Sequence, residues 1–101
     1  MIVAISISPS GADETGGVSD AVADAVRVIR ESGLPNETNA MFTNIEGEWD
    51  EVMAVVKQAV FRVAESSPRV GLVLKADLRQ GFDTGQLAAK VDRVEERLRD
   101  A

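Results

Sequence analysis

The chain has 101 residues, a net charge of −6, and no cysteine, histidine or tyrosine. This length fits one domain over residues 1–101. Lacking cysteine and histidine, the chain has no disulfides, thiolate metal sites, Cys nucleophile, Ser-His-Asp triad or usual zinc ligands. Carboxylate chemistry, hard cations and pure binding remain, and we expect no metal and no cofactor. The acidic balance argues against nucleic acid as a partner and suits a cationic small molecule. No apolar run could span a membrane, and the first residues lack a secretory signal, so we expect a cytoplasmic protein.

Residues 2–8 alternate in the manner of a β-strand, with Val3, Ile5 and Ile7 on one face. The other face carries small side chains, which include Ala4, Ser6 and Ser8. A helix is predicted over residues 20–32, with Ser19 as its N-cap and Gly33 as a left-handed C-cap. Residues 37–46 follow as short extended segments that turn near Ala40–Phe42.

A long helix is predicted over residues 48–65, and Val55 and Phe61 lie off its apolar stripe. The stripe consists of Trp49, Val52, Met53, Val56, Val60 and Val63. A strand over 69–77 turns Val70, Leu72, Leu74 and Ala76 towards one face. A last helix over 84–99 has a stripe of Leu87, Val91, Val94 and Leu98.

The predicted order is βαββαβ with a terminal helix, the pattern of an α+β ferredoxin-like fold with an antiparallel sheet. Right-handed crossovers place both main helices on one sheet face and the first strand between the third and fourth. The opposite face carries mostly small side chains, which allow a second subunit or a ligand to approach closely. Together with the off-stripe Phe61, this predicts self-association.

Polar residues at the end of the second hairpin strand form the first candidate site. Thr43, Asn44 and Glu46 precede the long helix, where side chains commonly line a pocket, and Trp49 follows. The alternative is that the acidic residues cap that helix and Trp49 fills the core, which is favoured for Glu48, Asp50 and Trp49, whereas a pocket is favoured for Thr43 and Glu46.

Two further groups lie on the open sheet face. Ser6 and Ser8 have hydroxyls that suit either a heterocyclic ligand or close packing between subunits. Lys75 and Asp77 suit an ion pair better than catalysis, since no nucleophile or acid–base partner accompanies them. Phosphate loops and calcium loops are absent, so no catalytic residue is assigned and a binding domain is favoured.

The order of these motifs resembles the small thiamine-binding protein family. The resemblance runs from Ser6-Ile7-Ser8-Pro9 to Lys90-Val91, and its most specific part is Thr43–Lys57. It implies a ferredoxin-like fold, dimers or tetramers whose sheets meet at their open faces, and binding of thiamine or its hydroxymethylpyrimidine moiety without chemistry. The ligand-binding residues expected on this basis are Ser6, Ser8, Thr43, Asn44, Glu46 and Trp49.

The chain departs from the family pattern at three positions. Asn36 stands where the family usually has an aromatic residue, and Val60-Phe61 stands where it often has His-Glu. These departures keep open a second hypothesis, a structural or regulatory oligomer whose ligand is lost or altered. An enzyme using Lys75 and Asp77 is a third.

Overall fold

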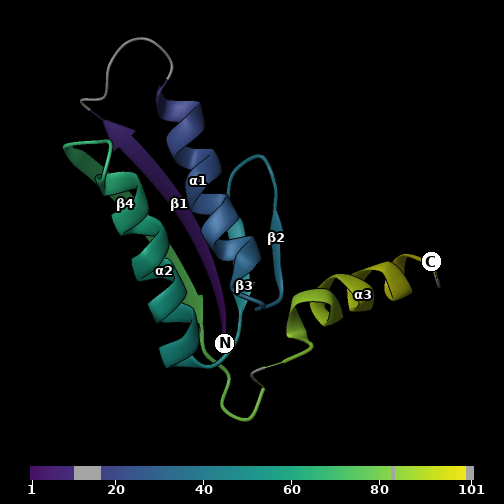
Figure 1. Cartoon of the computed structure of the whole chain (residues 1–101). Helices are drawn as coiled ribbons and strands as arrows, with labels where there is room; N and C mark the ends of the chain where they lie inside the picture. The colour runs from purple at the N-terminus through teal and green to yellow at the C-terminus, as the bar shows by residue number, and fades with distance from the viewer. Residues whose placement is uncertain (11–16, 83, 100–101) are drawn as a thin grey trace.

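Four strands and three helices follow one another in the order predicted from the sequence (Figure 1). The computed structural model describes residues 1–10, 17–82 and 84–99. The elements are β1 (Ile2–Ser10), α1 (Gly17–Glu31), β2 (Asn36–Thr38), β3 (Thr43–Glu46), α2 (Trp49–Ala64), β4 (Arg69–Asp77) and α3 (Gln86–Arg99). The α+β ferredoxin-like fold with a C-terminal helix is therefore confirmed.

The sheet has the strand order β2-β3-β1-β4, and all its pairs are antiparallel. Strand β1 pairs with β4 along its whole length, from Ile2 to Ser10. Its pairing with β3 is shorter and ends where Ile5 meets Thr43. Beyond Ile5, β1 therefore pairs with β4 on one side and with no described strand on the β3 side.

Helices α1 and α2 cover one face of the sheet, and the core lies between them (Figure 1). Val3 and Ile5 of β1 and Ile45 of β3 point into this core, because alternate strand residues share a face. The helices contribute Ala21, Ala25, Ile29, Val52, Val55, Val56, Ala59 and Val63. This face of the sheet, called here the helix face, is the one that the alternation in residues 2–8 predicts.

The predicted stripe of α2 is wrong at two positions. Val55 is buried, because it lies one turn from Ala59 on the side that meets the sheet. Trp49 is 49% exposed, because the first turn of the helix, Trp49–Glu51, extends past the core. Phe61 is 62% exposed, as expected of a residue off the stripe.

The ends of α1 give one confirmation and one correction. Gly33 follows the helix with φ +83°, the left-handed conformation that glycine adopts without strain. Ser19 is not the N-cap, because the helix already begins at Gly17 and Ser19 lies within its first turn. The helix therefore starts about one turn earlier than its apolar periodicity indicates.

The face of the sheet turned away from α1 and α2 is called here the open face. Among the described elements, only α3 approaches it, at the start of that helix. Strand β4 is poorly covered on both faces: Val73 is exposed on the open face, and Leu72 and Ala76 are exposed although predicted to meet the helices. The core reaches only Val70 and Leu74 of this edge strand.

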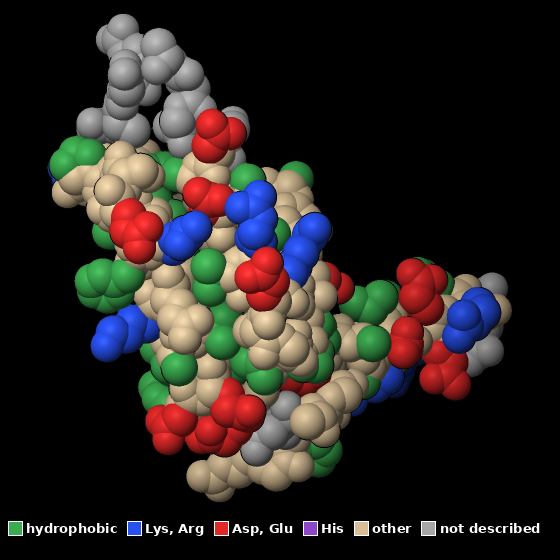
Figure 2. Space-filling model, viewed as in Figure 1, with side chains coloured by type: hydrophobic (Ala, Val, Ile, Leu, Met, Phe, Trp, Pro, Cys, Tyr) green, Lys and Arg blue, Asp and Glu red, His purple; other side chains and the backbone are tan. Residues whose placement is uncertain are grey.

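Helix α3 stands out from the body of the molecule, and charged side chains of both signs are visible along it (Figure 2). None of its residues is buried. Within the described ranges, no helix has the length and apolar character needed to cross a membrane.

Candidate functional site

Two hollows lie on opposite faces of the sheet. The first, called here the hairpin hollow, has a volume of about 220 Å³ and lies between β1, α1 and the loop that joins β2 to β3. Its lining residues are Ile5, Ser6, Ile7, Val22, Ala25, Val26, Ile29 and Thr38–Thr43. None of the described residues that line it is charged, so the hairpin hollow suits an uncharged ligand with a few hydrogen-bonding groups.

The polar side of the hairpin hollow is held in place by the β2–β3 hairpin. The hydroxyls of Thr38 and Thr43 lie 3.2 Å apart across the two strands, and Thr43 is buried. Asn39 Oδ1 accepts hydrogen bonds from the backbone amides of Met41 and Phe42, both at 2.9 Å. This side chain–backbone turn fixes the loop that closes the hairpin hollow.

The backbone of Ile7 adds a donor and an acceptor to the hairpin hollow. Met1 and Gly47 exchange two backbone hydrogen bonds, of 3.0 and 3.1 Å. Such closed pairs recur at every second residue of an antiparallel ladder, so Val3, Ile5 and Ile7 direct their N–H and C=O groups to the β3 side. Strand β3 begins opposite Ile5, so the N–H and C=O of Ile7 lie beyond the end of β3. They have no partner among the described residues.

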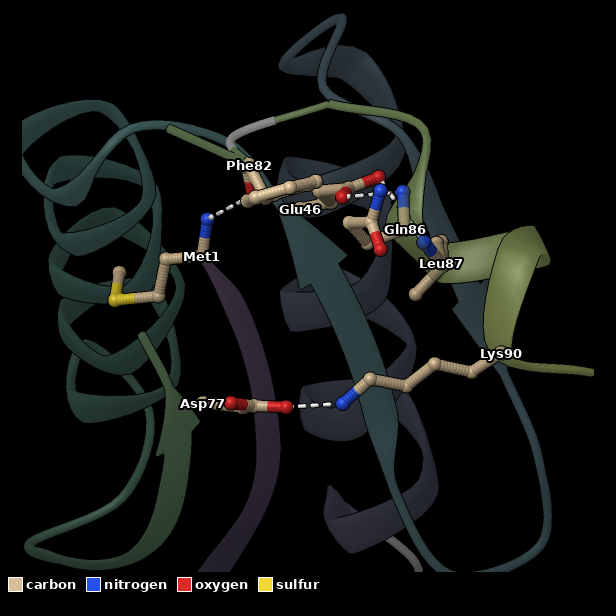
Figure 3. A network of polar contacts seen from close by, with 7 residues as sticks. All are labelled: Met1, Glu46, Asp77, Phe82, Gln86, Leu87 and Lys90. Atoms are coloured by element: carbon tan, nitrogen blue, oxygen red, sulfur yellow. Dashed lines mark hydrogen bonds and ion pairs between the residues drawn. The ribbon is translucent and has the colours of Figure 1, made fainter. Parts of the chain in front are cut away.

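The second hollow, of about 270 Å³, lies on the open face at the start of α3 and is called here the open-face hollow. Its lining residues are Ile2, Ala4, Glu37, Asn44, Lys75, Asp77, Leu87, Lys90 and Val91. Asn44 Nδ2 donates to Glu37 Oε1 at 3.1 Å, and Lys90 forms an ion pair with Asp77 (Figure 3). The hydrogen bond and charge of Lys90 hold the pKa of Asp77 below its usual value. The polar groups of this hollow thus largely satisfy one another.

Glu46 lies at the junction of β3 and α3, and the residue is 1% exposed. Its carboxylate accepts hydrogen bonds from the backbone amides of Gln86 at 2.7 Å and Leu87 at 3.2 Å (Figure 3). These are among the first N–H groups of α3, which have no partner within the helix. Glu46 therefore caps α3 from a strand 40 residues earlier in the chain.

The structure divides the six residues expected to bind the ligand. Thr43 and Ser6 line the hairpin hollow, and Asn44 lines the open-face hollow. Glu46 binds the start of α3, while Ser8 and Trp49 line neither hollow. The split follows from strand geometry, because the consecutive residues Thr43 and Asn44 point to opposite faces of β3.

The sequence interpretation missed several residues that shape the hairpin hollow. The backbone edge of Ile7 has no side-chain signature, and only the early start of β3 exposes it. Asn39 could have been found from the sequence, since asparagine at the start of a turn commonly accepts hydrogen bonds from the amides two and three residues later.

Asn36, at the family's aromatic position, donates a hydrogen bond from Nδ2 to the carbonyl of Leu34 at 2.8 Å.

The sequence of the chain matches a known protein family and its members over most of its length. Residues 3–95 match the family model described as "Thiamine-binding protein". A UPF0045 protein of Mycobacterium bovis is 52% identical over 99 residues, covering 97% of this chain and 94% of that protein. A UPF0045 protein of the fungus Eremothecium gossypii is 36% identical over 103 residues, covering 98% and 93%.

Solved structures share the fold. A Thermotoga maritima protein, proposed to act in thiamine biosynthesis or salvage, has a TM-score of 0.74 at 26% identity, with 88% of this chain and 94% of that chain covered. A hypothetical protein of Methanocaldococcus jannaschii has a TM-score of 0.72 at 32% identity, covering 89% and 92%.

Proposed function

Because the chain belongs to the thiamine-binding protein family, we propose that it binds thiamine, or the hydroxymethylpyrimidine moiety of thiamine, without chemical conversion. The binding unit in this proposal is a homo-oligomer, a dimer or tetramer with contacts through the open sheet faces. Its role would be that of a carrier, sensor or storage protein. The thiamine-related role of the T. maritima relative supports the choice of ligand.

One observation supports the placement of the ligand: the hairpin hollow joins an apolar wall, two threonine hydroxyls and a backbone edge at Ile7 that has no partner among the described residues. An aminopyrimidine has an N–H donor next to a ring-nitrogen acceptor. The N–H and C=O of Ile7 offer the complementary pair, as an edge strand does. Thr43 would then contact the ring from the side, and Val22, Val26 and Ile29 would pack against its face.

The charge of thiamine also fits this placement. The pyrimidine half is neutral and the described lining of the hairpin hollow has no charged side chain, so no unpaired charge has to be buried against these residues. The cationic thiazolium would remain at the mouth, beside the exposed Met41 and within the field of a chain of net charge −6.

A structural or regulatory oligomer that has lost or altered its ligand is the second candidate. It is favoured by Asn36, which hydrogen-bonds to its own turn in place of offering an aromatic ring, and by the exposed Phe61. Val60 does not add to this case, because it packs against the core.

The test is a thermal melt of the full chain with thiamine, hydroxymethylpyrimidine and thiamine pyrophosphate, followed by calorimetric titration. A ligand at about 100 times its Kd stabilises the fold by about 2.7 kcal/mol, a shift of several degrees. Thr43→Val, which removes only the hydroxyl, should weaken binding about tenfold, whereas Asn44→Ala on the open face should leave it unchanged.

No shift with any of the three compounds would favour the structural oligomer. A loss confined to Asn44→Ala would move the ligand to the open-face hollow and contradict the proposed site.

A further inference from the structure

Helix α3 carries an apolar stripe that begins at the half-buried Leu87, and nothing in the described chain covers the part beyond this residue. Val91, Val94 and Leu98 are 54, 58 and 64% exposed. Leu87 and Val91 border the open-face hollow, while Val94 and Leu98 lie further along the helix, outside that hollow. An isolated helix of this length is marginally stable in water, so the stripe needs a partner.

The spacing of the stripe identifies the kind of partner. Leu87, Val91, Val94 and Leu98 follow one another at intervals of four, three and four residues. Over just under two heptads, these residues take the positions of a coiled-coil seam, with Val91 and Leu98 at a positions and Leu87 and Val94 at d positions. A helix that packs on a sheet or a globular core has a broader stripe, like the one in α2. The α3 seam is narrow and suits another helix with the same spacing.

The charges beside the seam favour a second copy in parallel orientation. Lys90 and Arg97 lie on one flank, at g positions, and Glu95 lies on the other, at an e position. In a parallel pair, the g residue of one helix meets the e residue five positions on in its partner. Lys90 therefore meets Glu95 of the second copy, and two-fold symmetry repeats the pair.

An antiparallel pair would have the opposite electrostatics. The flanks would then meet g to g, which places Lys90 beside Arg97 of the second copy and repeats the repulsion across the two-fold axis. Lys90 already pairs with Asp77 of its own chain. Its ammonium group carries three N–H donors, so one lysine can serve both carboxylates.

We propose that α3 pairs in parallel with α3 of a second copy of this chain. This goes beyond the proposed ligand site, because it assigns a self-association surface to a helix that the hairpin hollow does not involve. Glu46 holds the start of each α3 on its own sheet, so pairing of the helices brings the two open faces close together.

Cysteine crosslinking in the full chain tests this directly, because the natural sequence has no cysteine. Val94→Cys places one thiol in the seam, where parallel pairing sets it opposite its own copy at disulfide distance. Glu96→Cys, on the outer side of the helix, is the matched control. Under mild oxidation, we expect near-complete dimer for Val94→Cys and little for Glu96→Cys.

Charge reversal gives an independent readout by light scattering or ultracentrifugation. Glu95→Lys should weaken the dimer by roughly tenfold or more, since two attractive pairs become repulsive. The triple variant Asp77→Lys/Lys90→Glu/Glu95→Lys reverses all three charges, so it keeps an opposite charge at position 77 for residue 90 and should restore most of the affinity. Glu96→Lys, which makes the same charge change on the outer side, should have little effect.

The proposal is overturned if Val94→Cys crosslinks no better than Glu96→Cys. It is also overturned if crosslinking requires a mixture of Val91→Cys and Val94→Cys chains, since only antiparallel pairing sets these two positions opposite each other. Neither result bears on ligand binding, which the thiamine melts measure separately.

Discussion

Helices α2 and α3 have nearly the same length but are stabilised in different ways. Helix α2 has 16 residues, five of them buried, and α3 has 14 residues with none buried. Helix α2 begins with its own capping box, in which Glu48 accepts from the amides of Asp50 and Glu51, and Glu51 accepts from that of Glu48. Helix α3 is capped by Glu46, a residue of the sheet.

The two helices therefore differ in how much of their stability comes from contacts within one chain. The stability of α2 comes from its packing against the sheet and α1, as is usual for helices in globular proteins. Helix α3 is attached at its first turn and by the ion pair of Lys90 with Asp77. Its stability must therefore depend on Glu46 and on a partner for its apolar seam.

Truncation of one valine in each helix should give the largest difference between α2 and α3 in the free energy of unfolding. Val56→Ala in α2 should lower the free energy of unfolding by about 2 kcal/mol, because the side chain is buried and leaves a cavity. Val94→Ala in α3 should cost little in dilute protein and more as the protein concentration rises. Urea unfolding at two protein concentrations measures both; an equal, concentration-independent loss would remove the distinction between the helices.

Replacing the capping glutamate of each helix by glutamine should give a smaller difference in the free energy of unfolding. Glu46→Gln should cost about 2 kcal/mol, because it removes a buried charge that accepts two amide hydrogen bonds. Glu48→Gln, at an exposed cap, should cost about 0.5 kcal/mol. Hydrogen exchange should show faster opening of α3 in the first variant and of α2 in the second. Unchanged exchange of α3 in Glu46→Gln would show that the cap does not hold this helix.

Acidification should have the smallest effect, again on α3. The pKa of Asp77 is lowered from 3.8 by Lys90, so its ion pair stabilises the fold above that value. This contribution is lost as the pH falls through the lower pKa of the folded state. Amide exchange in α3 is followed from about pH 5 to pH 2 and divided by the intrinsic exchange rate at each pH; this ratio should rise on acidification in the natural chain, and Asp77→Asn should remove the rise. Identical pH profiles for the natural chain and Asp77→Asn would contradict a stabilising ion pair between Asp77 and Lys90.

Most of the fold follows from local patterns in the sequence. Alternation places Val3 and Ile5 on the helix face, and the glycine after α1 predicts its left-handed C-cap. Helical periodicity finds α2 and α3 within about two residues of their ends. Periodicity does not predict which side of α2 meets the sheet. Val55 and Val56 are equally apolar neighbours, and only the packing of the folded chain shows that both are buried.

The candidate site was less predictable, because it depends on groups that are distant in sequence or carry no sequence signal. The carboxylate of Glu46 meets amides 40 and 41 residues later, which no local spacing shows. The edge of Ile7 is backbone, which every residue has, and its exposure depends on where β3 begins. Strand alternation alone would have separated Thr43 from Asn44, although both follow the same hairpin loop.

An ¹⁵N-resolved NMR titration of the chain with hydroxymethylpyrimidine tests the central claim most directly, since each amide reports on its own surroundings. We predict that the amide of Ile7 shifts as its N–H gains a hydrogen bond, together with the amides of Thr43 and the hairpin loop. Residues of the open-face hollow, such as Ala4 and Lys75, should stay unchanged. Shifts confined to the open face, or no shifts at millimolar ligand, would contradict binding in the hairpin hollow.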